Sequence, residues 1–293
     1  MTIFNRALLC IATLGMAACE GQLVVELSRG DSLTMTELRP EVRGIVLQRE
    51  DQSRTRLDGG GLSGADLLAW STGERRVVVD VSEVPSGRFT GVGLVVATSG
   101  GRVRFRDDSA RRNLAPVGAE GPIAAIDLRI DEDEEQTLWL RLEPHFSVTD
   151  PSLDDASSAR FRPVIRAVQP DRARQLSGVV PRTLLESAEC RPDAASVDQG
   201  ETVGAAVYLY EGTVSQFNDY VEGSAFNPLA AGALRRQANN DYRYEIFDLP
   251  PGSYVAALFC NADQDRPDQL DLLPALRTEA VEVDATDTIL DLL

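Results

Sequence analysis

The sequence predicts an all-β protein made of two antiparallel β-sandwich domains in tandem. Short segments of alternating apolar and polar residues recur along the chain, separated by Gly, Pro, Ser and Asp, which is typical of such sandwiches. A polar, proline-led linker at residues 170–175 divides these segments into two groups. One short segment, residues 64–70, has the composition of about two helical turns, and it is too short to change the fold class.

The first domain is predicted to span residues 19–169. Its expected strands share an alternation that gathers apolar side chains on one face. They are residues 23–27, 42–50, 76–81, 89–98, 102–106, 136–142 and 160–168.

The second domain is predicted to span residues 176–293. Its expected strands are residues 176–180, 203–210, 242–247, 254–260, 278–283 and 288–292. The turn at residues 248–252 contains two prolines and a glycine, which preset and permit a chain reversal. The segment from 212 to 240 is expected to be a loop.

Each domain resembles a known family. The first is similar to the domain of unknown function 4382 (DUF4382) family of bacterial secreted proteins and lipoproteins, in residues 23–27, 66–68, 84–96 and 161–168. That family has no established activity, so the resemblance implies no functional residue. The second resembles the carboxypeptidase regulatory-like modules, in residues 203–210 and 244–256. This implies a transthyretin-like or carbohydrate-binding-like fold, whose members are mostly structural or adhesive and sometimes bind sugars.

Residues 1–18 are predicted to be a cleaved signal peptide. Arg6 precedes an uncharged apolar run that ends at residue 18, which is shorter than the ~20 residues that span a bilayer. The sequence Met16-Ala17-Ala18-Cys19 resembles the bacterial lipobox, with methionine where leucine is usual.

The lipobox resemblance implies that Cys19 is acylated and anchors the protein in the bacterial cell envelope. Glu20 stands where an aspartate would favour the inner membrane, so we expect the outer membrane. Ordinary secretion after cleavage at residue 18 is the main alternative. A cytoplasmic protein with an apolar start is the second.

Two of the four cysteines remain once the leader and the lipid site are assigned. Cys10 lies in the leader and Cys19 carries the lipid, which leaves Cys190 and Cys260. In an oxidising compartment such a pair is expected to form a disulfide. The 70-residue separation would stabilise the fold by roughly 4 kcal/mol.

The charge of the chain excludes some partners and chemistries. The net charge is −17, and all 29 basic residues are arginine. Such acidity argues against a nucleic-acid partner, because binding requires neutralisation of phosphates. The absence of lysine excludes Schiff-base and Ser-Lys chemistry.

The sequence offers little for catalysis, and no cofactor is expected apart from a cation. His145, the only histidine, either acts as a base with Glu143 nearby or is a structural residue at the end of a strand. Ser63 lacks the Gly-x-Ser-x-Gly spacing of a hydrolase nucleophile. Zinc sites need histidine and cysteine ligands, which this chain lacks.

An acidic segment after Cys260 suggests a calcium site. It places four carboxylates within nine residues, at Asp263, Asp265, Asp268 and Asp271. Calcium prefers such oxygen ligands, although the glycine and terminal glutamate of an EF-hand are absent. The alternative is a solvated acidic loop held by the disulfide.

Two further groups are candidates for ligand binding. Arg102, Arg104 and Arg106 share one strand face. One interpretation is that they bind the phosphates or carboxylates of a ligand such as lipopolysaccharide. The other is that they pair with neighbouring acidic side chains on a solvated face. Tyr208 and Tyr210 lie opposite the apolar face of their strand. We therefore expect them to point outward, where they either stack on sugar rings or pack on the surface.

These features predict a non-enzymatic, lipid-anchored envelope protein with a binding or scaffolding role. A carbohydrate or another envelope protein is the expected partner. A calcium-stabilised adhesion module is the alternative, and a hydrolase is the remote one.

Overall fold

The computed structural model describes residues 20–106, 108–149, 157–187, 190, 204–271 and 273–293, without the side chains of residues 81 and 82. The predicted signal peptide and Cys19 lie outside these residues. The fold is all-β, which confirms the predicted class. No helix in the described ranges is long and apolar enough to span a bilayer.

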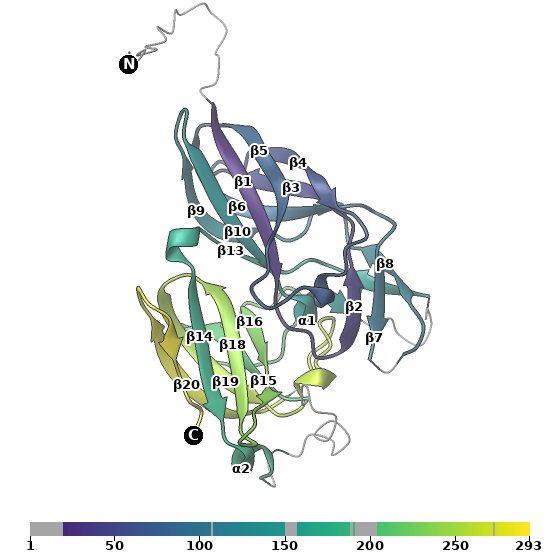
Figure 1. Cartoon of the computed structure of the whole chain (residues 1–293), viewed down its shortest axis with the longest axis vertical. Coiled ribbons are helices and arrows are strands. Elements are labelled where there is room, and N and C mark those ends of the chain that lie inside the picture. Colours follow the sequence, from purple (N-terminus) through teal and green to yellow (C-terminus); the bar gives the residue numbers. More distant parts are fainter. Residues whose placement is uncertain (1–19, 107, 150–156, 188–189, 191–203, 272) are drawn as a thin grey trace, which may run out of the picture.

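The N-terminal half contains a sandwich of two four-stranded sheets (Figure 1). Sheet A consists, in order, of β13 (Ile165–Val168), β10 (Glu135–Leu142), β1 (Glu20–Arg29) and β5 (Arg76–Pro85). Sheet C consists of β4 (Arg54–Leu62), β3 (Val42–Gln48), β6 (Gly87–Val96) and β9 (Ala124–Ile130). Alternation explains the packing: Leu23, Val25 and Leu27 of β1 are fully buried in one cluster with Ile45 and Leu47 of β3.

A third sheet of the N-terminal half extends the same core. Sheet B consists of β11 (Val148–Thr149), β12 (Ser158–Phe161), β8 (Arg112–Pro116), β7 (Arg102–Phe105) and β2 (Met35–Arg39). The predicted helical patch forms only the 3₁₀ turn η1 (Leu67–Ala69), which Asp66 caps by accepting from the backbone of Leu68. A one-turn helix, α1 (Pro144–Ser147), follows β10.

The C-terminal half is a second sandwich. Sheet D consists of β17 (Arg235–Arg236), β18 (Tyr242–Leu249), β14 (Arg174–Val180) and β21 (Thr288–Ile289). Sheet E consists of β16 (Ala230–Ala233), β15 (Ala206–Glu211), β19 (Gly252–Phe259) and β20 (Ala275–Val283). Its helical turns are η2 (Pro170–Arg172), which leads into it within the predicted linker, α2 (Arg182–Leu185) and η3 (Ala262–Gln264).

The strand pairing is antiparallel with three exceptions among the described strands. β1 pairs with β10, β8 with β12 and β14 with β21 in parallel. Parallel partners are joined by long connections rather than hairpins. The alternation within each strand therefore gives no sign of them, and the expectation of purely antiparallel sheets is corrected at these three pairs.

The predicted disulfide is confirmed. Cys190, which follows α2, bonds to Cys260 at the end of β19. Both cysteines belong to the core of the C-terminal half. The bond therefore fixes the chain after α2 to sheet E.

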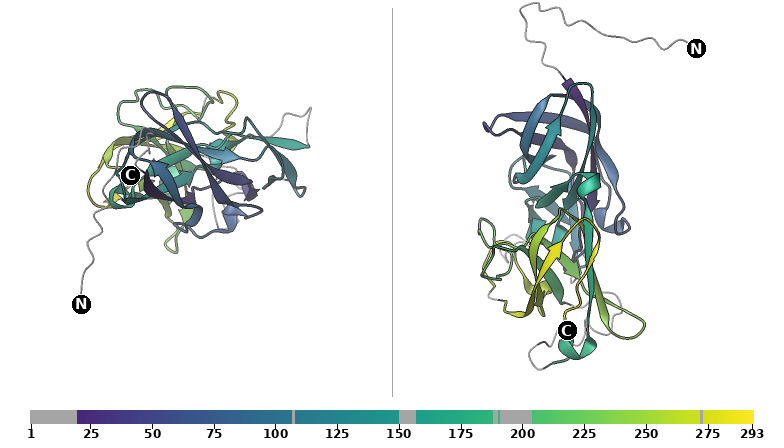
Figure 2. Two further views of the ribbon diagram at one scale, coloured as in Figure 1. Left: turned by 90° about the horizontal axis from the view of Figure 1, so that it is seen from above. Right: turned by 90° about the vertical axis from the view of Figure 1, so that its left-hand side faces the viewer.

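Sheet E is buried on both faces at β15 and β16. Val207 and Leu209 of β15 pack into the core that sheet E shares with sheet D. Tyr208 and Tyr210, on the opposite face, pack in a second cluster with Leu33 and Phe146 of the N-terminal half. The two halves thus stack end to end along the long axis of the molecule (Figures 1 and 2).

Candidate functional site

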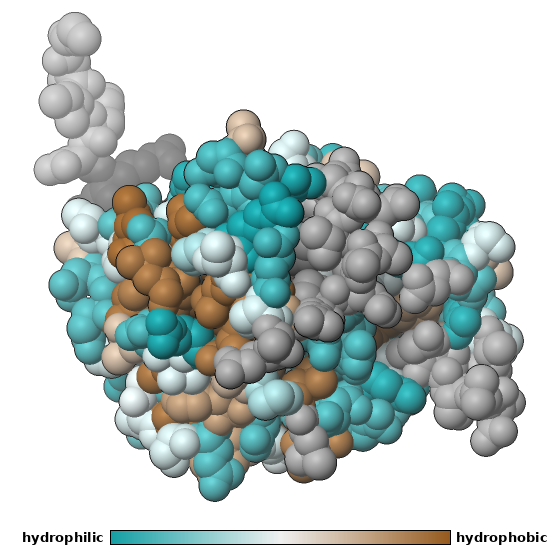
Figure 3. Space-filling model, turned by 90° about the horizontal axis from the view of Figure 1, so that it is seen from below, coloured by the Kyte–Doolittle hydropathy of each residue, from teal (hydrophilic) through white to brown (hydrophobic). Residues whose placement is uncertain are grey.

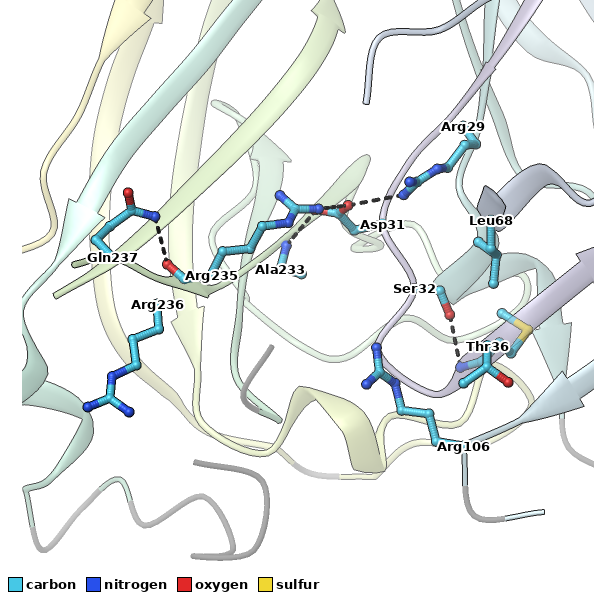
Figure 4. Close-up of a pocket in the computed structure, with 11 residues that line it drawn as sticks. Arg29, Asp31, Ser32, Thr36, Leu68, Arg106, Ala233, Arg235, Arg236 and Gln237 are labelled. Atoms are coloured by element: carbon cyan, nitrogen blue, oxygen red, sulfur yellow. Dashed lines mark hydrogen bonds and ion pairs between the residues drawn. The ribbon is translucent and has the colours of Figure 1, made fainter. Parts of the chain in front are cut away.

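A cleft of about 720 Å³ lies between the two halves (Figure 4). The N-terminal half lines it with the end of β1, the segment that leads into β2, η1 and the residue after β7. The C-terminal half contributes the end of β16 and β17. The lining residues are Arg29, Asp31, Ser32, Met35, Thr36, Leu68, Arg106, Ala233, Arg235, Arg236 and Gln237.

Asp31 joins the two sides of this cleft. Its Oδ2 accepts a hydrogen bond from the backbone N–H of Ala233 at 3.0 Å, and its Oδ1 pairs with Arg235 and, at 3.5 Å, with Arg29. Arg29 also donates to the carbonyl of Trp70 at 2.7 Å. The carboxylate is 6% exposed, and because it pairs with two arginines, this part of the cleft keeps one positive charge in excess.

Arginine exceeds carboxylate in the cleft by four to one. Within the described part of the chain, Arg106 forms no ion pair or side-chain hydrogen bond, and it is exposed. Arg236 donates to the neutral amide oxygen of Asn240 at 2.6 and 3.1 Å. These two groups come from opposite halves (Figure 4), and both can bind an anion without breaking an ion pair.

A buried charge network connects the halves next to the cleft. Asp248, near the end of β18, pairs with Arg141 at 3.2 Å and with Arg75, and it accepts from the Ser28 hydroxyl at 2.9 Å. Burial disfavours its charged form, yet Arg141, Arg75 and Ser28 together hold the pKa of Asp248 below its ordinary value.

Glu143 forms the other part of this network. It accepts from Arg166 at 2.7 and 3.1 Å, and Arg166 also donates to the carbonyl of Asp248 at 3.0 Å. Burial raises the pKa of Glu143, although Arg166 and Arg141 oppose the shift. Together these contacts hold the two halves in one arrangement.

The expectation that Tyr208 and Tyr210 point to solvent is wrong. Both are fully buried, because Phe146 and His145 of the N-terminal half cover Tyr208, while Phe217 and Asn218 of the loop after β15 cover Tyr210. Phe146 packs edge-on against Tyr208, with ring centroids 5.3 Å apart, and stacks on Tyr220 at 4.8 Å. In this structure Tyr208 and Tyr210 are therefore not accessible for stacking on a sugar.

His145 lies in the same interface. Its Nε2 is 2.8 Å from the Tyr208 hydroxyl, which donates to Asp265 Oδ2 at 2.7 Å. Burial lowers the pKa of His145 to about 4, so the ring is neutral at pH 7. The Glu143 carboxylate is engaged by Arg166, and the pair suggested as a catalytic base is instead part of the packing between the halves.

The four acidic residues suggested as a calcium site do not form one cluster. Asp265 and Asp271 converge with Asp219, from the loop after β15. Asp268 lies 3.9 Å from Arg266, and the backbone N–H of Asp263 donates to Gly204. No local pattern marks Asp219, since its contact with Asp271 spans 52 residues of sequence.

Of the three arginines at 102, 104 and 106, two pair with neighbouring side chains and one is available to a ligand. Arg104 pairs with Glu37 at 3.5 Å and Arg102 donates to Asn113, as in a strand paired with its neighbours. Arg106 lines the cleft. The other cleft arginines come from two separate segments, Arg29 at the end of β1 and the adjacent Arg235 and Arg236 of β17, and nothing in the sequence brings these segments together.

The lower end of the molecule carries exposed apolar side chains. Ile289 and Leu293, close to the C-terminus, are 77% and 71% exposed. Figure 3, which looks at this end, shows hydrophobic side chains gathered in one area beside a mainly hydrophilic surface.

Comparisons with known proteins do not assign a family. No family model and no curated protein matches the chain, so the two family resemblances stay predictions. Among solved structures, the Bacillus anthracis TIE protein is 10% identical, with a TM-score of 0.18, over 93% of this chain and 33% of that one. The chain thus spans about a third of its length.

Two other solved structures cover most of the chain. A protein from Bacteroides ovatus proposed to be an adhesin is 10% identical, with a TM-score of 0.19, over 94% of this chain and 93% of that one. The fimbrial anchor protein Mfa2 from Porphyromonas gingivalis is 7% identical, with a TM-score of 0.18, over 87% and 82%. TM-scores this low do not establish a shared fold.

Proposed function

We propose that this protein is a non-enzymatic, lipid-anchored protein of the bacterial cell envelope that binds an acidic carbohydrate in the cleft between its halves. The observation that carries the proposal is the local reversal of charge. Four arginines and one aspartate line the cleft, in a chain of net charge −17. A concave site of this kind concentrates anions.

The size and the chemistry of the lining support a carbohydrate with carboxylate or phosphate groups. The volume of about 720 Å³ lies within the range of roughly 300–1,000 Å³ that is usual for small-molecule sites. Guanidinium groups bind carboxylates and phosphates through paired hydrogen bonds. The hydroxyls of Ser32 and Thr36 and the amide of Gln237 suit the hydroxyls of a sugar ring.

The same lining supports binding rather than reaction. Asp31 supplies the only carboxylate among the lining residues, and both of its oxygens already accept from Ala233, Arg29 or Arg235. A general base must be able to reach a substrate proton, and a nucleophile needs an adjacent base. The described lining residues provide neither arrangement.

A lipid at Cys19 would place the N-terminal half against the membrane. Cys19 directly precedes β1, which begins at the upper end of the molecule and runs down toward the C-terminal half (Figure 1). Metabolic labelling with a fatty acid should label the natural protein and not Cys19→Ser. Equal labelling of the two, or none in either, would refute the anchor.

Binding is tested with a glycan array and calorimetry, using oligosaccharides that carry uronic acid or phosphate and their neutral counterparts. Arg106→Gln and Arg236→Gln should each weaken the binding of acidic glycans about tenfold or more, because a hydrogen bond to a charged group contributes about 1.5–3 kcal/mol. Raising the salt concentration should weaken it too. The control is Arg129→Gln, which changes an arginine 76% exposed and paired with Asp131.

Two results would contradict the proposal. If neutral glycans bind as tightly as acidic ones, or if the double variant of Arg106 and Arg236 binds like the natural protein, the cleft is not the site. If inorganic phosphate alone binds as tightly as any glycan, the cleft binds anions and the carbohydrate part of the proposal is wrong.

A further inference from the structure

Three aspartates from two loops meet beside the interface of the halves. They are Asp219, in the loop after β15, and Asp265 and Asp271, in the segment after η3. One carboxylate oxygen of each lies within 4.8 Å of the others. The loops are held together by hydrogen bonds from the backbone N–H of Asp271 to Asp219 Oδ2, at 2.5 Å, and from that of Tyr220 to Asp265 Oδ2, at 3.2 Å.

Two of these carboxylates keep a buried oxygen without a partner. Asp219 is 1% exposed and Asp265 is 5% exposed, and neither Asp219 Oδ1 nor Asp265 Oδ1 accepts a hydrogen bond. No arginine in the described ranges forms an ion pair with any of the three aspartates. Buried carboxylates without a positive partner are costly, whereas every other buried aspartate of the interface has its arginine.

We propose that Asp219, Asp265 and Asp271 bind a divalent cation, Ca²⁺, that ties the two loops together. Carboxylate oxygens are the ligands of hard cations, and the two unpartnered oxygens are available for coordination. Two oxygens bound to the same Ca²⁺ lie at most about 5 Å apart, because each Ca–O distance is about 2.3–2.6 Å. The separations in the cluster satisfy this limit, and three carboxylates exceed the one or two that usually hold Mg²⁺.

The site is coupled to the packing of the halves. Asp265 Oδ2 accepts from the Tyr208 hydroxyl, which in turn contacts His145 of the N-terminal half. Bound Ca²⁺ would fix the orientation of Asp265 and thereby support this contact. The cation should therefore stabilise the whole described fold and not only the loops.

The experiment measures the melting temperature Tm of the full mature chain after treatment with EDTA, with and without Ca²⁺. At a free Ca²⁺ concentration 100 times its Kd we expect Tm to rise by about 5–10 °C. Asp219→Asn and Asp271→Asn should abolish the rise. Asp268→Asn, in the same segment but outside the cluster, should retain it.

A second measurement covers variants that fold poorly. Tb³⁺, which replaces Ca²⁺ at oxygen sites, should show luminescence sensitised by the nearby tyrosines, and Ca²⁺ should displace it from the natural protein and from Asp268→Asn. A Tm that does not respond to Ca²⁺, or an undiminished response in Asp219→Asn, overturns the site. A response to Mg²⁺ as large as that to Ca²⁺ overturns the choice of cation.

Discussion

Asp248 is the residue on which the contact between the halves depends most directly. Its side chain is 4% exposed and faces two arginines, Arg141 and Arg75, and the Ser28 hydroxyl, all from the N-terminal half. Its φ of 59° lies in the left-handed region, which asparagine also tolerates. Asp248→Asn therefore removes the charge while retaining the shape and the backbone conformation.

The expected loss of stability arises because the substitution leaves the buried charge of Arg141 without its main partner. Removing one partner of a buried ion pair typically costs about 3–5 kcal/mol, because the other charge stays buried without compensation. Arg141 is 3% exposed, and its next carboxylate, Glu143, is 4.0 Å away and already bound to Arg166. We expect a loss of about 3 kcal/mol in the free energy of unfolding, since Glu143 compensates Arg141 in part.

Urea denaturation followed by tryptophan fluorescence measures this change. The matched control is Asp127→Asn, which removes the charge of an exposed pair with Arg88 and should leave the free energy of unfolding almost unchanged. If Asp248→Asn is as stable as this control, the network does not hold the halves together, and the reasoning fails.

Three further perturbations test other parts of the fold by the same denaturation assay. Replacing Cys190 and Cys260 by serine should cost roughly 4 kcal/mol, because the unfolded chain regains a loop of 70 residues; an unchanged midpoint would contradict this. Tyr208→Phe should cost about 1–3 kcal/mol, because Asp265 loses a buried donor; a neutral effect would mean that water replaces the hydroxyl. The pKa of His145 is about 4 in the folded protein, below the ordinary value of about 6.5, so the unfolded chain binds more protons and stability is lost as the pH falls from 6.5 towards 4. At pH 5 this loss is about 2 kcal/mol, because stability changes by about 1.36 kcal/mol per pH unit between the two pKa values. The difference in the free energy of unfolding between the natural protein and His145→Gln should therefore shrink by that amount from pH 7 to pH 5. A constant difference would refute a buried neutral histidine.

Alternation is a property of each strand alone, and it located strands such as β1, β6, β10, β15 and β19. It did not reveal β2, β4, β8 and β9 of the N-terminal half, nor β16 and β17, which lie in the segment 212–240 that was expected to be a loop. β15 shows the limit of predicting burial from alternation. The sequence correctly placed Val207 and Leu209 on one face and Tyr208 and Tyr210 on the other. It could not show that the second face is covered too, since the covering residues, such as Phe146, come from the other half of the chain.

The candidate sites show the same division between local and distant information. Counting cysteines sufficed for the disulfide, because two remained after the others were assigned. The acidic segment pointed to Asp265 and Asp271, but Asp219 joins them through the fold alone. Likewise, Arg106 was part of a visible arginine strand, whereas Arg235 reaches the cleft only because Asp31 brings the halves together.

The double burial of sheet E has a consequence for how the chain is made and how it can be dissected. A fragment that begins at β14 would lose Phe146 and His145, which cover Tyr208, and the apolar surface thus exposed favours self-association. The N-terminal half emerges first during synthesis and can serve as the template on which that face closes. We therefore expect the two sandwiches to unfold as one unit, and moving either into another protein would require a substitute for its partner.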